Sequence, residues 1–185
     1  MKKICAIFLL CVFMLPRGGE TPAAAGAQID EGAARAAISS KTEDIVACVE
    51  IHDYDNDGTE EAFIVTAKSY DMDIYEGCTI WFYKNESLDI VEDKDIFGYP
   101  KDILETNNHF YFVWEKSGGG SSSVSYVYGV KDGSFCEANI SKKYMDFGRN
   151  ENGEIFAWSD DWSKGYHDII EHVFEYNPDT REFYE

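Results

Sequence analysis

Hydrophobic and polar residues alternate along most of the chain beyond residue 44, and this period of two predicts β-strands. Before that point, alanine and isoleucine recur at helical spacing and predict a short N-terminal helix over residues 30–40. One helical turn is predicted at 99–104, where Pro100 would stand at the start and its missing N–H would cost nothing. The predicted strands cover residues 45–52, 62–68, 78–84, 88–91, 109–115, 124–130, 135–139, 155–158, 169–176 and 181–184.

The predicted strand at 109–115 is apolar at nearly every position. Its alternation places Phe110, Phe112 and Trp114 on one face and Tyr111 and Val113 on the other. Glycine and serine then dominate residues 117–123, and strand patterns continue on both sides of them. We therefore expect a hairpin loop there rather than a linker between domains.

A weak repeat runs through the predicted strands. Three times, at Trp81, Tyr126 and Val173, an aromatic strand enters a turn and a short return strand. The spacing of about 45 residues is close to the period of propeller blades, but three units are too few for the usual ~4–8 blades. We expect a mainly β, antiparallel meander, either a sandwich or partly propeller-like, with one short N-terminal helix. It would form a single domain over residues 28–185.

The first 27 residues predict an export signal. Two lysines precede an uncharged, largely apolar run over residues 4–15, which is shorter than the ~20 residues of a transmembrane helix. An alanine-rich stretch follows, with small residues suited to cleavage after Ala25 or Ala27. We favour Ala27, which would make Gln28 the first residue of a secreted or cell-surface protein.

The cysteines leave two questions open. Cys11 would be the lipidated residue of a lipoprotein, but residues 8–10 lack the small side chain usually found just before such a cysteine. The lipoprotein is therefore the second choice. Cys48, Cys78 and Cys136 would remain after cleavage, as one disulfide and a free thiol or as three buried thiols.

Charge narrows the range of partners. The 185 residues contain 16 basic and 35 acidic side chains, giving a formal net charge of −19. This balance argues against nucleic acid or an anionic membrane as a partner, because phosphate binding needs clustered positive charge. With 44% hydrophobic residues, the chain has enough apolar material for a core. Beyond the signal, no apolar stretch is long enough to span a membrane.

Catalytic signatures are missing from the sequence. The four histidines form no metal-protease pattern, and no nucleophile elbow, P-loop or dinucleotide fingerprint is present. We therefore expect a binding module for an extracellular polymer or protein rather than an enzyme. The alternatives are an extracellular hydrolase acting on carbohydrate and a purely structural envelope protein.

One segment carries ion-binding chemistry, the acidic run over residues 53–61, which reads D-x-D-x-D-G-x-x-E. Alternating side chains of a tight loop converge, and hard oxygen ligands of this kind suit Ca²⁺. Gly58 stands where such a loop turns sharply and needs a positive φ. The predicted ligands are the side chains of Asp53, Asp55, Asp57 and Glu61 and the backbone carbonyl of Thr59.

The loop is not an EF-hand. Counted from Asp53, its twelfth position is Ile64 instead of the glutamate of an EF-hand, and its flanks are predicted strands instead of helices. It resembles instead the calcium loops of FG-GAP and VCBS β-propeller repeats. This resemblance implies a Ca²⁺ site that Glu61 closes. Extracellular calcium modules bind at ~10⁻⁴ to 10⁻³ M, so the ion would serve to fix the hairpin. The alternative is an exposed, Asx-rich turn that binds no metal.

Aromatic residues give a further candidate surface. Trp162 and Tyr166 fall in a polar, glycine-containing stretch that predicts a loop. Exposed rings there could stack on a sugar or on a partner protein. Trp158, at the start of the same stretch, is expected to fold back and cap the sheet.

Four segments together resemble uncharacterised modules of exported proteins from Gram-positive gut bacteria. They are D-Y-D-N-D-G-T-E-E-A-F (53–63), T-I-W-F (79–82), V-S-Y-V-Y-G-V-K-D-G (124–133) and E-A-N-I-S (137–141). The resemblance extends over nearly all of residues 28–185. It implies export and a single domain, and no activity.

Overall fold

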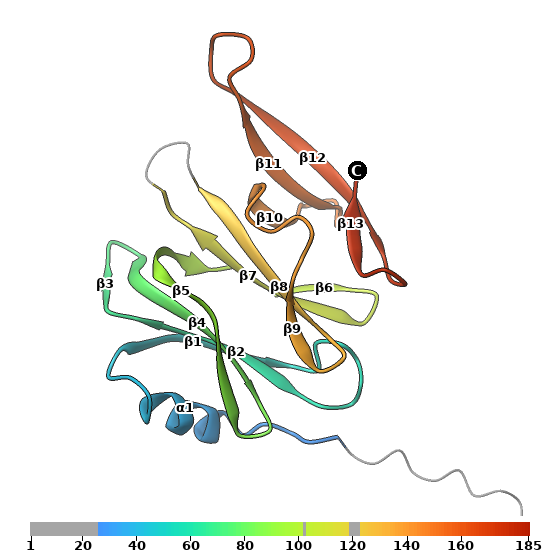
Figure 1. The fold of residues 1–185 in the computed structure, drawn as a ribbon. Coiled ribbons are helices and arrows are strands. Elements are labelled where there is room, and N and C mark those ends of the chain that lie inside the picture. The colour runs from blue at the N-terminus through green and yellow to red at the C-terminus, as the bar shows by residue number, and fades with distance from the viewer. Residues whose placement is uncertain (1–25, 102, 119–122) are drawn as a thin grey trace, which may run out of the picture.

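The computed structural model describes residues 26–101, 103–118 and 123–185, so nearly all of the predicted export signal lies outside the described residues. The described chain is mainly antiparallel β structure with one helix, α1 (Glu31–Ser39), as predicted (Figure 1). The larger sheet contains β1 (Ile45–His52), β2 (Glu61–Ala67), β3 (Ser69–Asp71), β4 (Ile74–Lys84), β5 (Ser87–Pro100), β6 (Leu104–Thr106), β7 (His109–Lys116), β8 (Val124–Lys131) and β9 (Ser134–Glu137). The smaller sheet contains β10 (Met145–Arg149), β11 (Ile155–Asp161), β12 (Asp168–Asn177) and β13 (Glu182–Tyr184).

The larger sheet bends around its own core. Its strands follow the order β1-β2-β4-β5-β7-β8-β9. The long strand β5 pairs with β4 through a register interrupted by irregularities and then pairs with β7 over Gly98–Pro100. This bend brings side chains of β2 against those of β7 and β8, which are not its neighbours in the sheet. The ring of Phe63, for example, stacks on that of Phe112 with centroids 5.2 Å apart.

Strand β7 separates two cores, as its sequence predicts. Phe112 and Trp114 point into the first core, inside the bent sheet. Tyr111 and Val113 point the other way, into a second core that includes Phe147 of β10. The smaller sheet covers this outer face of β7 and β8, so the strand is buried on both sides and cannot carry the usual polar face.

Helix α1 covers the other end of the larger sheet. Ala34 and Ile38 are fully buried in a third cluster with residues of β2 and β4. Asp30 caps the helix by accepting a hydrogen bond from the backbone N–H of Ala33 at 2.9 Å. Within the described residues, no helix has the length and apolar character needed to cross a membrane.

The helical turn predicted at 99–104 is wrong. Tyr99 and Pro100 are the last residues of β5, and Leu104 begins β6. Pro100 is tolerated in a strand at its terminal position, and the pairing of β5 with β7 holds the backbone extended. Strands β3, β6 and β10 were not predicted, because all three are short and contain too few alternating residues to give a clear pattern.

The three repeated hairpins are present, but they do not form separate blades. The hairpins β4–β5 and β8–β9 belong to the larger sheet, and β12–β13 belongs to the smaller one. The fold is therefore layered, with α1 on one part of the larger sheet and the smaller sheet on another (Figure 1).

The cysteines in the described chain are free thiols. Cys78 is buried, and Cys48 and Cys136 are partly buried. Burial raises the pKa of Cys48 and of Cys78 to about 12. Both therefore remain protonated and poorly nucleophilic at neutral pH.

Candidate metal centre

The acidic segment forms the loop of the β1–β2 hairpin and coils around the carboxylate of Asp53. One oxygen of Asp53 accepts a hydrogen bond from the backbone N–H of Asp57, and the other accepts one from Gly58, both at 2.9 Å. Gly58 has a φ of +89°, the positive value that the sequence predicts for a sharp turn. The loop is therefore held by its own side chains.

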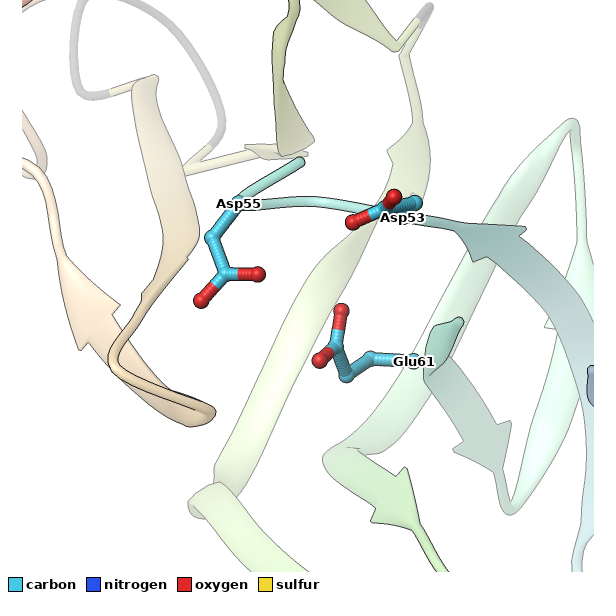
Figure 2. Close-up of side chains that lie close together, drawn as sticks. All are labelled: Asp53, Asp55 and Glu61. Carbon is cyan, nitrogen blue, oxygen red and sulfur yellow. The ribbon is translucent and has the colours of Figure 1, made fainter. Parts of the chain in front are cut away.

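Three of the predicted ligands meet in this loop. Asp53, Asp55 and Glu61 each offer an oxygen within 4.8 Å of those of the other two, and they could hold a metal ion (Figure 2). Glu61 is fully buried and Asp55 is only 7% exposed. Two acidic groups buried beside a third repel one another and lose hydration, so a cation placed between them would be strongly favoured.

The structure places the other two predicted ligands outside this triad. The Oδ1 of Asp57 accepts a hydrogen bond from the backbone N–H of Thr59 at 2.7 Å, and the Asp57 side chain is 44% exposed. Asp57 and Thr59 thus stabilise the outer part of the loop in the structure. Whether either of them also binds an ion stays a prediction.

Asp55 has the most unusual environment of the three. Its Oδ2 accepts a hydrogen bond of 3.1 Å from the backbone N–H of Gly133, in the β8–β9 turn. Its Oδ1 is buried and has no hydrogen-bond partner among the described residues. A buried carboxylate oxygen without a partner is costly, and such oxygens are rare unless an ion or a water satisfies them.

Lys84, at the end of β4, is a member of the site that the sequence analysis missed. Its Nζ lies 2.5 Å from Oε1 of Glu61 and 3.8 Å from Oδ2 of Asp57. Burial raises the pKa of Glu61 and outweighs the opposite effect of Lys84. Burial tends to lower the pKa of Lys84, but the hydrogen bond and the charge of Glu61 have a larger, opposite effect. The pKa of Lys84 is therefore raised above its ordinary value of 10.5. Lys84 therefore stays charged and neutralises part of the cluster.

A signal for Lys84 was present in the strand pattern. Ala62 pairs with Tyr83 across β2 and β4, and one step further along this antiparallel register brings Glu61 opposite Lys84. Opposite charges at facing positions of paired strands attract each other. No comparable signal exists for Gly133, because its Asp-Gly turn is recognisable only as a turn and its contact with Asp55 spans 78 residues.

Comparison of the chain with protein-family models, curated proteins and solved structures finds no match. The resemblance of the loop to FG-GAP and VCBS repeats therefore stays a prediction from the loop residues, as does the resemblance to exported bacterial modules.

The aromatic pair proposed for ligand contact lies on the smaller sheet, whereas the acidic loop belongs to the larger one. Trp162 and Tyr166 occupy the tip of the β11–β12 hairpin, and each is 58% exposed. The ring of Trp162 stacks on that of His167, with centroids 4.6 Å apart. Trp158 is half-buried and makes an edge contact with the ring of Phe156. A role of Trp162 and Tyr166 in binding stays a prediction.

The raised pKa of Glu61 predicts an unusual response of the metal-free protein to acid. The folded state holds a proton on Glu61 more tightly than the unfolded state does. The proton on Glu61 therefore stabilises the folded state in full at pH values below the ordinary glutamate pKa. This stabilisation is lost as pH rises through the raised pKa of Glu61. Melting of the wild type and of Glu61→Gln should be compared without metal from about pH 4 to pH 8.

The difference between the two proteins isolates Glu61, because every other carboxylate titrates in both. We expect the wild type to gain stability relative to Glu61→Gln as pH falls. Curves that stay parallel over the whole range would contradict the raised pKa.

Proposed function

We propose that the chain is an exported binding module whose β1–β2 loop binds Ca²⁺. The observation that carries this proposal is the Oδ1 atom of Asp55, which is buried beside two further carboxylates and has no partner in the described part of the chain. Lys84 supplies one positive charge against Asp53, Asp55, Asp57 and Glu61, so the site retains a net negative charge. A divalent cation would coordinate the unpartnered oxygen and balance the excess negative charge of the loop.

The ligand chemistry favours Ca²⁺ over other ions. The triad offers carboxylate oxygens only, and such hard donors select Ca²⁺ or Mg²⁺ over transition metals. Mg²⁺ demands near-octahedral geometry and gives up its water reluctantly, whereas Ca²⁺ accepts irregular sets of oxygens. An irregular loop whose carboxylates come from residues 53, 55 and 61 suits the larger ion.

The role we assign to the ion is structural. Asp53 and Glu61 lie at the two ends of the β1–β2 loop, and Asp55 connects that loop to the β8–β9 turn. An ion bound between them would tie the two hairpins together. Export, implied by residues 1–27, would bring the protein into surroundings where millimolar Ca²⁺ can fill a site of modest affinity.

Ca²⁺ is expected to stabilise the protein in a saturable manner. A ligand at 100 times its dissociation constant adds about 2.7 kcal/mol to the free energy of unfolding. For a chain of this length, that should raise the melting temperature by about 5–10 °C. The measurement is thermal melting of residues 28–185 in EDTA and in increasing Ca²⁺, with Mg²⁺ and ionic-strength controls.

The Asp55→Asn variant tests the site directly. Its amide oxygen can keep the hydrogen bond from Gly133, while the negative charge and the free carboxylate oxygen are lost. We expect this variant to lose the Ca²⁺ effect and to be more stable than the wild type in EDTA. Asp179→Asn, which removes an exposed charge from the β12–β13 turn, should keep the full effect. Equal melting of the wild type in EDTA and in millimolar Ca²⁺ would overturn the proposal.

A further inference from the structure

A second acidic site lies where the smaller sheet meets the larger one. A groove of about 540 Å³ opens there, and both sheets contribute to its walls. The end of β5, the end of β7 and strands β10, β11 and β12 all contribute lining residues to it. Its lining residues are Tyr99, Glu115, Ser123, Met145, Asp146, Trp158 and Ile169. None of them belongs to the metal centre.

Glu115 is the distinctive residue of this groove. It continues the row of Tyr111 and Val113 on the face of β7 that the smaller sheet covers, so the second core ends on a carboxyl group. The residue is only 3% exposed. Its Oε2 accepts hydrogen bonds from the Ser125 hydroxyl at 2.5 Å and from the backbone N–H of Asp146 at 3.2 Å. These two bonds hold the start of β10 against β7 and β8.

The other oxygen of Glu115 has no such role. No hydrogen bond to Oε1 is made by the described residues, and no described cationic side chain forms an ion pair with Glu115. The nearby Lys101 is hydrogen-bonded to Asp146 instead. Burial raises the pKa of Glu115 and outweighs the opposite effects of its two hydrogen bonds and of the nearby Lys101 charge. A buried charge in a folded protein is normally paired.

The surroundings of Glu115 favour an organic cation as its partner. Of the described residues, two with carboxylates line the groove, and Lys101 already compensates one of them, so a hard metal ion would find too few ligands. The remaining lining residues are the aromatic Tyr99 and Trp158, the apolar Met145 and Ile169, and Ser123. Aromatic faces beside a carboxylate attract ammonium groups, and apolar walls cover the attached carbon chain. The net charge of −19 draws cations towards the protein.

We propose that this groove binds an alkylammonium group, which pairs with Glu115, lies against the rings of Tyr99 and Trp158, and packs its aliphatic chain on Met145 and Ile169. The group could belong to a free amine or to a lysine side chain of a partner protein. Both sources present the same chemistry to the groove.

The test is an NMR titration of residues 28–185 in 150 mM salt with three small probes. n-Pentylammonium stands for a free amine, Nα-acetyl-lysine methylamide for a partner lysine, and n-pentanol is a neutral molecule of matched size. We expect dissociation constants on the order of 1 mM for the two cations and binding at least tenfold weaker for pentanol. The tighter of the two cations identifies the source.

Four variants assign the binding to the groove. Glu115→Gln and Trp158→Ala should each weaken binding of n-pentylammonium roughly tenfold. Glu151→Gln, which removes an exposed charge from the β10–β11 turn, and Trp162→Ala at the hairpin tip should leave it unchanged. Should Trp158→Ala fail to fold, Tyr99→Leu replaces it.

Pentanol binding as tightly as n-pentylammonium, or Glu115→Gln binding the cation as well as the wild type, would overturn the proposal. Absence of binding by both cations would do the same. Asp55→Asn should bind n-pentylammonium normally, so the result does not depend on whether the acidic loop holds Ca²⁺.

Discussion

Replacing Lys84 with methionine should destabilise the metal-free protein by about 3–5 kcal/mol, because the substitution leaves Glu61 buried without its counter-charge. Methionine is similar in length and uncharged, so packing changes little. Glu61 is fully buried and lies 2.5 Å from the Lys84 ammonium, which makes this pair far more sensitive than a surface ion pair. The loss should appear as a lower melting temperature in EDTA.

Ca²⁺ should reverse part of that loss. In the wild type the Lys84 ammonium already satisfies one carboxylate, and an incoming ion must share Glu61 with it. In Lys84→Met the ion has no such competitor, so the rise in melting temperature between EDTA and saturating Ca²⁺ should be larger than in the wild type. A rise no larger than that of the wild type would show that Lys84 and the ion do not share a site.

Lys164→Met is the matched control. Lys164 forms an ion pair with Asp168 in which both side chains are about half exposed. Such pairs contribute between about 0 and 1 kcal/mol. This variant should therefore melt close to the wild type and respond to Ca²⁺ equally.

Truncation of Phe63 is expected to affect both stability and ion binding. The residue is fully buried, and its ring contacts those of Tyr54, Phe82, Phe112 and Tyr128. Phe63→Ala should lower the free energy of unfolding by about 3–5 kcal/mol, through lost contacts and a cavity. Tyr54 packs on Phe63 and donates its backbone N–H to Glu61 at 3.3 Å. A loosened Tyr54 should raise the Ca²⁺ concentration at half-saturation several-fold.

Phe183→Ala separates the two effects. Phe183 is 2% exposed and belongs to the second core, where its ring contacts those of Tyr111, Phe147 and Tyr176. We expect a comparable loss of stability with an unchanged Ca²⁺ midpoint, measured at a temperature where both variants are folded. Equal shifts in the midpoint would mean that general loosening, rather than the packing of Tyr54, controls the affinity. Phe63→Leu offers a milder change if Phe63→Ala does not fold.

Much of the fold was readable from the sequence because its information is local. The alternation in residues 109–115 predicts the two opposite faces of β7, and the structure has both. The acidic loop was recognisable because Asp53, Asp55 and Glu61 lie within nine residues and the turn at Gly58 needs only its positive φ. The same spacing groups Asp57 with these three, but the structure places it outside the triad, where its side chain accepts a hydrogen bond from the backbone N–H of Thr59. The error at 99–104 has the opposite cause, since pairing with β7 decides the conformation of Tyr99 and Pro100.

The metal centre and the groove around Glu115 differ in how far apart their residues lie in the sequence. Asp53, Asp55 and Glu61 come from nine consecutive residues, whereas Glu115 and Asp146 come together only through the packing of two sheets. Nothing in the local pattern distinguishes Glu115 from an exposed glutamate. Its burial is a property of the smaller sheet, whose first strand, β10, is too short for its pattern to be recognised.

The hydrogen bond between Gly133 and Asp55 also bears on the order in which the molecule assembles. The residues are 78 positions apart, and Lys84 reaches the same loop from a third hairpin. During synthesis, the acidic loop therefore emerges long before the turn that completes its surroundings. Closing so long a segment costs entropy that only the finished sheet repays. Ca²⁺ would accordingly act late, by slowing unfolding of the completed sheet rather than by nucleating the hairpin.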